Sequence, residues 1–274
     1  ILFYGVGPDQ NQWTNEGFSY EKNIYSDTAY YFIRVGGANG KRIESKSSLT
    51  EDASLAVTSF NDHIVFEEEE TNLISSGRGW YGDRFNSGEG QTYSHQINGL
   101  NSGIDLVLSA VSESSEGGIF EISNGSDSVG SIELEEVPDG PGTTYSIKAF
   151  QEVDTFSLPN TNDFDFRINF DGGQSGERGY LDYYALLFTR NLRKYNNDET
   201  HFRVLESVGQ VTQYEIGNAS SATIWNVTDP ANVEEQSFST DGAKAIFKSQ
   251  DSALEEFVVF EGSDFPTPFI FRSV

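Results

Sequence analysis

Acidic side chains at alternate positions of one segment are the first residues in this chain that could bind a metal. In DFDFRINFDGG, the side chains of Asp163, Asp165 and Asp171 fall on one face if the segment is a strand, and carboxylate oxygens are preferred calcium ligands. An EF-hand loop is excluded, because its glycine position would put Arg167 and Arg178 at the first and last ligand positions. Two interpretations remain: calcium bound by some of these aspartates outside an EF-hand, or a solvated strand face, which we favour.

Nucleophilic catalysis finds little support. The chain has no cysteine, so a thiolate nucleophile, a disulfide and a cysteine-ligated zinc site are all excluded within these residues. Asp62 precedes His63 and could orient it as a base for a serine, but GGQSGERG misses the G-x-S-x-G spacing by one residue. We therefore predict no catalytic residue, and no cofactor unless calcium is bound.

An aromatic pair lies between glycines in SGRGWYGDRF. Trp80 and Tyr81 form this pair, and Arg84 follows it. Exposed aromatic side chains here, or Tyr180 elsewhere, could stack on a sugar ring or a protein partner. The alternative, which we favour, is a glycine-hinged corner that buries Trp80 and pairs Arg84 with an acid.

The charge of the chain excludes some partners. Asp and Glu outnumber Lys and Arg by 43 to 17, which gives a net charge of -26. Such a chain repels nucleic-acid phosphates and anionic membrane surfaces. No apolar run approaches the about 20 residues that span a bilayer. We predict no nucleic-acid partner and no direct membrane insertion.

Short apolar stretches between glycine turns predict the elements that position these residues. In the 163–171 segment, Phe164, Phe166, Ile168 and Phe170 share the face opposite the acids. A similar pattern recurs over residues 29–35, 63–70, 104–111, 118–123 and 256–262. The predicted fold is all-β: an antiparallel jelly-roll-like β-sandwich with additional flanking β strands.

The longest aromatic and aliphatic run is GERGYLDYYALLFTRNLRKYNN, residues 176–197. Its apolar residues alternate as in a strand, yet several also recur at helical spacing. Preceding glycines and β-rich surroundings favour a central strand with both faces covered. We expect Asp182 and Arg190 to anchor the ends of this strand.

Five segments occur in one order: NIYSDTAYYFIRVG, SGRGWYGDRF, GERGYLDYYALLFTRNLR, FRVLES and IWNVTDP. In this order they resemble the β-rich region upstream of the catalytic domain in gingipain-like cysteine peptidases of family C25, in particular PorU-type sortases of the type IX secretion system of Bacteroidetes. The resemblance extends from Asn23 to about Phe271. Asn226 departs from it, since an acid is expected at that position. The motif residues that we expect to serve structure or interaction are Trp80, Tyr81, Arg84, Asp182, Tyr183, Arg190, Trp225 and Asp229.

The resemblance implies an exported protein at the cell surface, associated with the outer membrane. The parent would cleave C-terminal targeting domains from exported cargo and help attach that cargo to surface lipopolysaccharide. Implied partners are its own or an associated C25-type catalytic domain, an outer-membrane β-barrel of the secretion system, and cargo proteins. No residue here matches a catalytic residue of the family, so this region would be non-catalytic. The alternatives are a carbohydrate-binding β-sandwich module and a surface assembly or adhesion subunit.

The expected organisation has three parts. Residues 1–60 are N-terminal strands of a preceding unit, and residues 61–229 form the jelly-roll-like sandwich. Residues 230–274 are a small β segment that leads into a missing catalytic domain.

Overall fold

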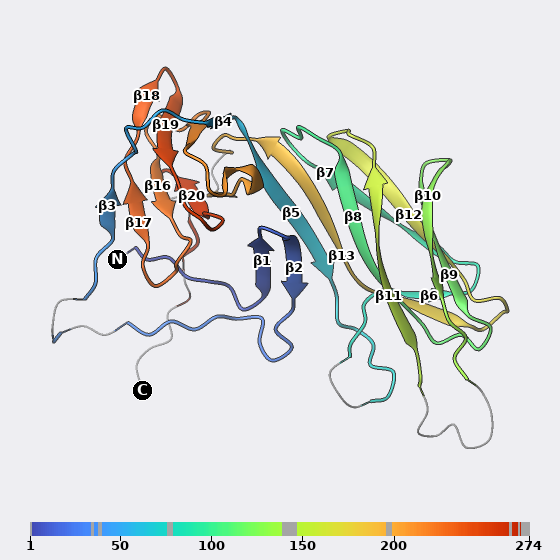
Figure 1. Cartoon of the computed structure of the whole chain (residues 1–274). Coiled ribbons are helices and arrows are strands. Elements are labelled where there is room, and N and C mark those ends of the chain that lie inside the picture. Colours follow the sequence, from blue (N-terminus) through green and yellow to red (C-terminus); the bar gives the residue numbers. More distant parts are fainter. Residues whose placement is uncertain are drawn as a thin grey trace. The chain divides into compact units, whose positions relative to one another are not determined.

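The computed structural model describes residues 2–33, 36–37, 40–75, 79–138, 147–195, 199–262, 265–267 and 269. Regular structure in these residues is almost entirely β-strand, with one short 3-10 turn, η2 (Leu205–Ser207). The chain divides into two compact units, shown in Figure 1. Unit 1 combines Ile1–Asn61 with Asn191–Val274, and unit 2 is Asp62–Arg190. The all-β prediction is confirmed.

Unit 2 is a sandwich of two sheets. One has the strand order β10-β9-β12-β7, and the other has the order β11-β8-β13-β5 with β6 paired to β13. Its strands are β5 (Ser59–Glu67, which begins in unit 1), β6 (Arg84–Asn86), β7 (Gly90–Gln96), β8 (Ile104–Ser112), β9 (Gly118–Asn124), β10 (Asp127–Leu134), β11 (Phe150–Leu158), β12 (Asp163–Asp171) and β13 (Arg178–Asn191).

The core of unit 2 lies between the two sheets because their strands alternate in hydrophobicity. On β12, Phe164, Phe166, Ile168 and Phe170 are buried, as the period of two predicts. Phe166 contacts Tyr184 of the opposite sheet at 5.2 Å between ring centroids, with the rings at 89°. Edge-to-face contact of this kind is favourable for aromatic pairs, so the two inner faces interlock through their rings.

Strand β13 lies inside its sheet, between β8 and β5, as the sequence predicts for a central strand. Its pairing with β8 shifts register between Leu181 and Tyr183, which is a β-bulge at Asp182. Leu181 before the bulge and Tyr184 after it both belong to the core, although simple alternation would put them on opposite faces. One extra residue exchanges the two faces of a strand, so that residues after it point to the opposite side of the sheet from the side that simple alternation predicts. The bulge therefore decides which side chains after it face the core. Tyr183, which alternation groups with Leu181, is only half-buried.

Unit 1 contains a hairpin and two larger sheets. The hairpin pairs β1 (Gln10–Thr14) with β2 (Gly17–Glu21). The sheets have the orders β14-β20-β16-β17-β3 and β18-β19-β15-β4. Their strands are β3 (Glu44–Lys46), β4 (Leu55–Val57), β14 (Thr200–Phe202), β15 (Thr212–Ile216), β16 (Thr223–Asn226), β17 (Glu234–Gln236), β18 (Ser239–Asp241), β19 (Lys244–Ser249) and β20 (Phe257–Phe260).

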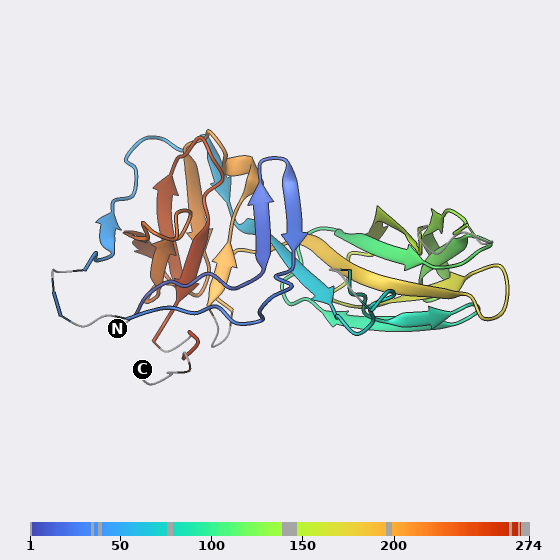
Figure 2. The same cartoon turned by 90° about the horizontal axis from the view of Figure 1, so that it is seen from below.

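The N-terminal strands of unit 1 join sheets formed by the C-terminal part of the chain. Strand β3 pairs in parallel with β17, and β4 pairs in parallel with β15. Figures 1 and 2 show β3, in blue, beside the orange strands of the C-terminal part. The sequence predicts boundaries near residues 60 and 230. In the structure, the residues before the first boundary and those after the second belong to the same compact unit, unit 1. Of the predicted strand 29–35, residues 29–33 form no regular structure, and 34–35 lie outside the described residues. No helix in the described part of the chain is long and apolar enough to cross a membrane.

Candidate functional site

A cleft of about 650 Å³ opens in unit 2 at one end of β7 and β12. The turn between β9 and β10 and the loop between β11 and β12 complete it. Its lining residues are Ser94, His95, Gln96, Asn124, Gly125, Pro159, Thr161, Asp163, Phe164 and Asp165. Two of the three sequence-predicted calcium candidates therefore line one cleft, which the sequence alone did not reveal.

Cross-strand pairing arranges the polar side chains of this cleft. Asp163 lies opposite Gln96, and Asp165 lies opposite Ser94, so these residues share the solvent-facing side of the sheet. The Gln96 amide donates to Asp163 Oδ1 at 2.7 Å. The Asn124 amide donates to the backbone oxygen of Asp165 at 2.6 Å. These bonds hold the amide side chains against β12.

Aromatic rings form part of the cleft wall. The rings of His95 and Phe164 are stacked, with centroids 5.6 Å apart and planes at 27°. His95 Nε2 lies 2.9 Å from the Tyr184 hydroxyl. Burial lowers the pKa of His95 below its ordinary value, because a charged imidazole loses hydration in the protein interior. No lysine or arginine is among the residues that line the cleft.

The three calcium candidates do not form one metal site. Asp163 and Asp171 are the first and last residues of β12, so at about 3.3 Å per residue they lie roughly 26 Å apart. Asp171 Oδ1 instead accepts the backbone N–H of Gly173 at 2.9 Å and the Ser87 hydroxyl at 3.3 Å. Among the described residues, no group of three or more His, Cys, Asp or Glu is placed to hold a metal ion.

The expectation that Trp80 is buried is wrong, since its side chain is 42% exposed. Tyr81 is half-buried and forms backbone hydrogen bonds with Thr71. Its ring lies 6.0 Å from that of Tyr180, which is only 1% exposed and so cannot stack on a ligand. Arg84 is exposed on β6, and no ion pair joins it to an acid in the described ranges. Thus Trp80 is the only member of the sequence-predicted aromatic set that is exposed.

Asp182 lies at the bulge of β13, and its side chain is on the face of the sheet that points away from the core. Its Oδ2 accepts the Ser109 hydroxyl at 2.9 Å and the Gln151 amide at 2.8 Å. Burial raises the pKa of Asp182, and the nearby charge of Glu69 adds to this, while the two hydrogen bonds oppose it. Burial, followed by the Asp182 and Glu67 charges, also raises the pKa of Tyr183. Asp182 therefore lies at the bulge rather than at a strand end.

Arg190 lies near the C-terminal end of β13, where it ties separate segments of unit 2 together. Its guanidinium Nη1 lies 2.8 Å from Asp62 Oδ2, and its Nε donates to the backbone oxygen of Asn98 at 3.0 Å. Both members of the ion pair are mostly shielded from solvent, so water screens the pair less than it would at the surface. The geometry gives Arg190 a structural role.

Trp225 and Asp229 also have structural environments, both in unit 1. Trp225 is buried, and its ring meets that of Phe260 edge-on at 4.9 Å. Asp229 is exposed and accepts hydrogen bonds from the Asn232 amide and from the backbone N–H of Ala231. These two bonds lower the pKa of Asp229. They close a turn around the Asp-Pro step.

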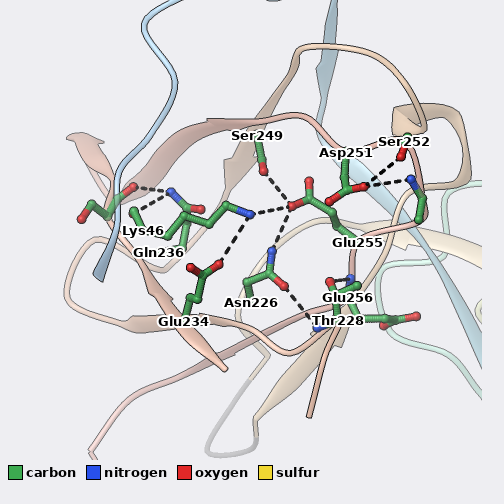
Figure 3. A network of polar contacts seen from close by, with 12 residues as sticks. Lys46, Asn226, Thr228, Glu234, Gln236, Ser249, Asp251, Ser252, Glu255 and Glu256 are labelled. Atoms are coloured by element: carbon green, nitrogen blue, oxygen red, sulfur yellow. Dashed lines mark hydrogen bonds and ion pairs between the residues drawn. The ribbon is translucent and has the colours of Figure 1, made fainter. Parts of the chain in front are cut away.

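Sequence reasoning missed a buried carboxylate, Glu255, at the centre of the polar network in Figure 3. Glu255 is 3% exposed, and its Oε1 accepts from the Asn226 amide at 2.9 Å and the Ser249 hydroxyl at 2.8 Å. The Lys46 ammonium lies 3.1 Å from the same oxygen and joins β3 to the network. An acid at position 226 would face this carboxylate, whereas Asn226 donates to it. Asparagine at position 226 thus avoids placing a second carboxylate beside Glu255.

Comparisons with known proteins give a structural match. No protein-family model matches the sequence, and no curated protein matches it. The crystal structure of dimeric latent PorU from Porphyromonas gingivalis is similar over 94% of this chain, with a TM-score of 0.75 and 16% identity. The chain spans 26% of that PorU chain. At this identity the match establishes a common fold: the chain has a PorU-like β-rich structure.

Two carbohydrate-binding modules also have partial similarity. One is a CBM36 module in complex with calcium and xylotriose, at a TM-score of 0.30 and 12% identity over 47% of this chain and 99% of that one. The other is the C-terminal CBM6 of a laminarinase from Zobellia galactanivorans, at a TM-score of 0.29 and 17% identity over 46% of this chain and 98% of that one.

Proposed function

We propose that this chain is the non-catalytic structural and interaction region of a cell-surface cysteine peptidase of the PorU type, a sortase of the type IX secretion system. The observation that carries the proposal is the PorU-like fold along 94% of the chain. The order of the five sequence segments agrees with it. The absence of cysteine from the 274 residues also agrees, because a cysteine nucleophile would then belong to another part of the parent.

The parent protein would cleave the C-terminal targeting domain from exported cargo and help attach the cargo to surface lipopolysaccharide. In this proposal the chain contacts its own or an associated C25-type catalytic domain. An outer-membrane β-barrel and the cargo are further partners.

The first experiment is a peptidase assay on the purified chain with a fluorogenic peptide that carries a cargo targeting sequence. We expect no cleavage by the chain alone. The separately produced catalytic domain of the parent should co-elute with the chain in size-exclusion chromatography. Cleavage that persists in repurified chain would overturn the non-catalytic assignment, and failure to co-elute would overturn the interaction role.

Carbohydrate binding is a second candidate function. The specific observation in its favour is the 42% exposure of Trp80, because an exposed indole face can stack on a sugar ring. Glycan-array binding that is lost in Trp80→Ala would support this function at Trp80. Equal binding by the variant would exclude Trp80 as the sugar platform.

A further inference from the structure

We propose that the cleft of unit 2 binds a neutral oligosaccharide through Asp163, Asp165 and Asn124. This inference rests on the second candidate function and gives it a site other than Trp80. The cleft volume of about 650 Å³ falls within the range of about 300–1,000 Å³ that is usual for small-ligand sites.

The cleft offers several fixed hydrogen-bond acceptors. Gln96 occupies one oxygen of Asp163, and the Asn124 amide is bound to the backbone of Asp165. The second Asp163 oxygen, the Asp165 carboxylate and the Asn124 carbonyl remain at the lining. Ionised carboxylates only accept hydrogen bonds, so a ligand with many hydroxyl donors satisfies them. The hydroxyls of Ser94 and Thr161 can both donate and accept.

The remaining wall suits the less polar face of a sugar. Pro159 is exposed and the ring of His95 is partly exposed in this wall, and the buried ring of Phe164 stacks behind His95. Ring surfaces such as these pack against the C–H groups of a pyranose. Because the hydrogen bond to the Tyr184 hydroxyl fixes His95, this wall is preorganised, which reduces the entropy lost on binding.

Electrostatics favours a neutral sugar over a phosphorylated one. Two carboxylates line the cleft without a lysine or arginine among the lining residues, and the whole chain carries a net charge of -26. A phosphate group would enter a negative potential with no cation to bind it. The negative potential also attracts basic peptides, so a peptide ligand belongs among the outcomes of the test.

The test is isothermal titration calorimetry on the 274-residue chain with cello-, laminari-, xylo- and mannotetraose. We expect at least one to bind, and the double variant Asp163→Asn/Asp165→Asn to weaken its affinity at least ~10-fold, equivalent to about 1.4 kcal/mol. The matched control is Glu152→Gln/Asp154→Asn, which removes two exposed acids of β11 with the same change in charge. This control should bind like the wild type. Near-UV circular dichroism verifies that each variant is folded.

The outcomes separate this inference from the function on which it rests. Binding that survives in the cleft variant but is lost in Trp80→Ala overturns the cleft site and leaves carbohydrate binding in place. No heat with any of the four sugars overturns both. An arginine-rich peptide that binds in place of the sugars, and depends on Asp163 and Asp165, would overturn the ligand class.

Discussion

At the scale of single residues, two polar side chains have structural roles that their residue types alone do not predict. Asp182 stabilises a bulge by accepting from Ser109 and Gln151 with one oxygen. Asn226 donates to the buried Glu255. In both places a carboxylate must be matched by donors, because an uncompensated buried acid is costly.

Replacement of Asp182 should separate its hydrogen bonds from its charge. Asp182→Ala should lower the free energy of unfolding by about 1–3 kcal/mol, because the buried Ser109 hydroxyl loses the acceptor to which it donates. Asp182→Asn should cost less, since its carbonyl oxygen can accept both bonds. Urea denaturation of the two variants measures this difference. Equal destabilisation by both would show that the charge, rather than the bonds, matters.

The raised pKa of Asp182 also predicts a pH dependence. The folded state holds this proton more tightly than the unfolded state, whose pKa is near the ordinary 3.8. The contribution of Asp182 to stability is therefore greatest at low pH and declines as pH rises from about 4 through the folded pKa. Asp182→Asn lacks this ionisation, so its stability relative to the wild type should improve over that interval. A difference that is constant from about pH 4 to about pH 7 would contradict the shift.

At the scale of elements, β13 shows how a strand depends on its neighbours. Its hydrophobic residues predict a covered central strand, but the register shift at Asp182 reverses which of them face the core. Gly179 lies just before the bulge and opposite Ser112 of β8. The close approach of two phenylalanine rings leaves no room for a side chain at Gly179.

Gly179→Ala should destabilise unit 2 through overpacking. The added Cβ would lie 2.5 Å from Phe120 Cζ and 2.8 Å from Phe170 Cδ2, and both rings are buried. We expect a loss of about 1–3 kcal/mol in the free energy of unfolding. Gly103→Ala is the matched control, because a Cβ there meets nothing within 4 Å. Thermal or urea unfolding compares the two, and similar stabilities would refute the packing argument.

At the scale of the whole molecule, each unit has its own core. The cluster that includes Phe166 and Tyr184 belongs to unit 2, and the cluster that includes Tyr214 and Phe257 belongs to unit 1. The first and last residues of unit 2, Asp62 and Arg190, form an ion pair at 2.8 Å. Unit 2 is thus an insertion in the sequence of unit 1 whose two ends meet.

The separate core of unit 2 predicts that residues 62–190 fold when expressed alone. The fragment should unfold in one cooperative transition and keep its near-UV circular dichroism, since its core residues come from within it. A second fragment, 1–61 joined to 191–274 by a short glycine-serine linker, serves as the reciprocal test for unit 1. A fragment 62–190 without a cooperative transition would show that unit 2 needs the rest of the chain.

The sequence by itself determined the class of fold and its most regular strand. The alternation from Asp163 to Asp171 is local, and a period of two can be satisfied only by a strand with one buried face. The exclusion of cysteine chemistry is also a property of composition alone. The exposure of Trp80 could not be predicted in this way, because glycines beside an aromatic residue permit either a buried or an exposed corner.

Only the tertiary structure decided the features that join distant residues. The parallel pairing of β3 with β17 and of β4 with β15, the polar network around Glu255 and the cleft around Asp163 each combine segments far apart in the chain. The bulge at Asp182 depends likewise on Ser109 and Gln151. The physical reason is that strand register and side-chain burial are set by contacts between strands that are distant in the sequence. Such contacts produce no periodic pattern in the sequence of either strand.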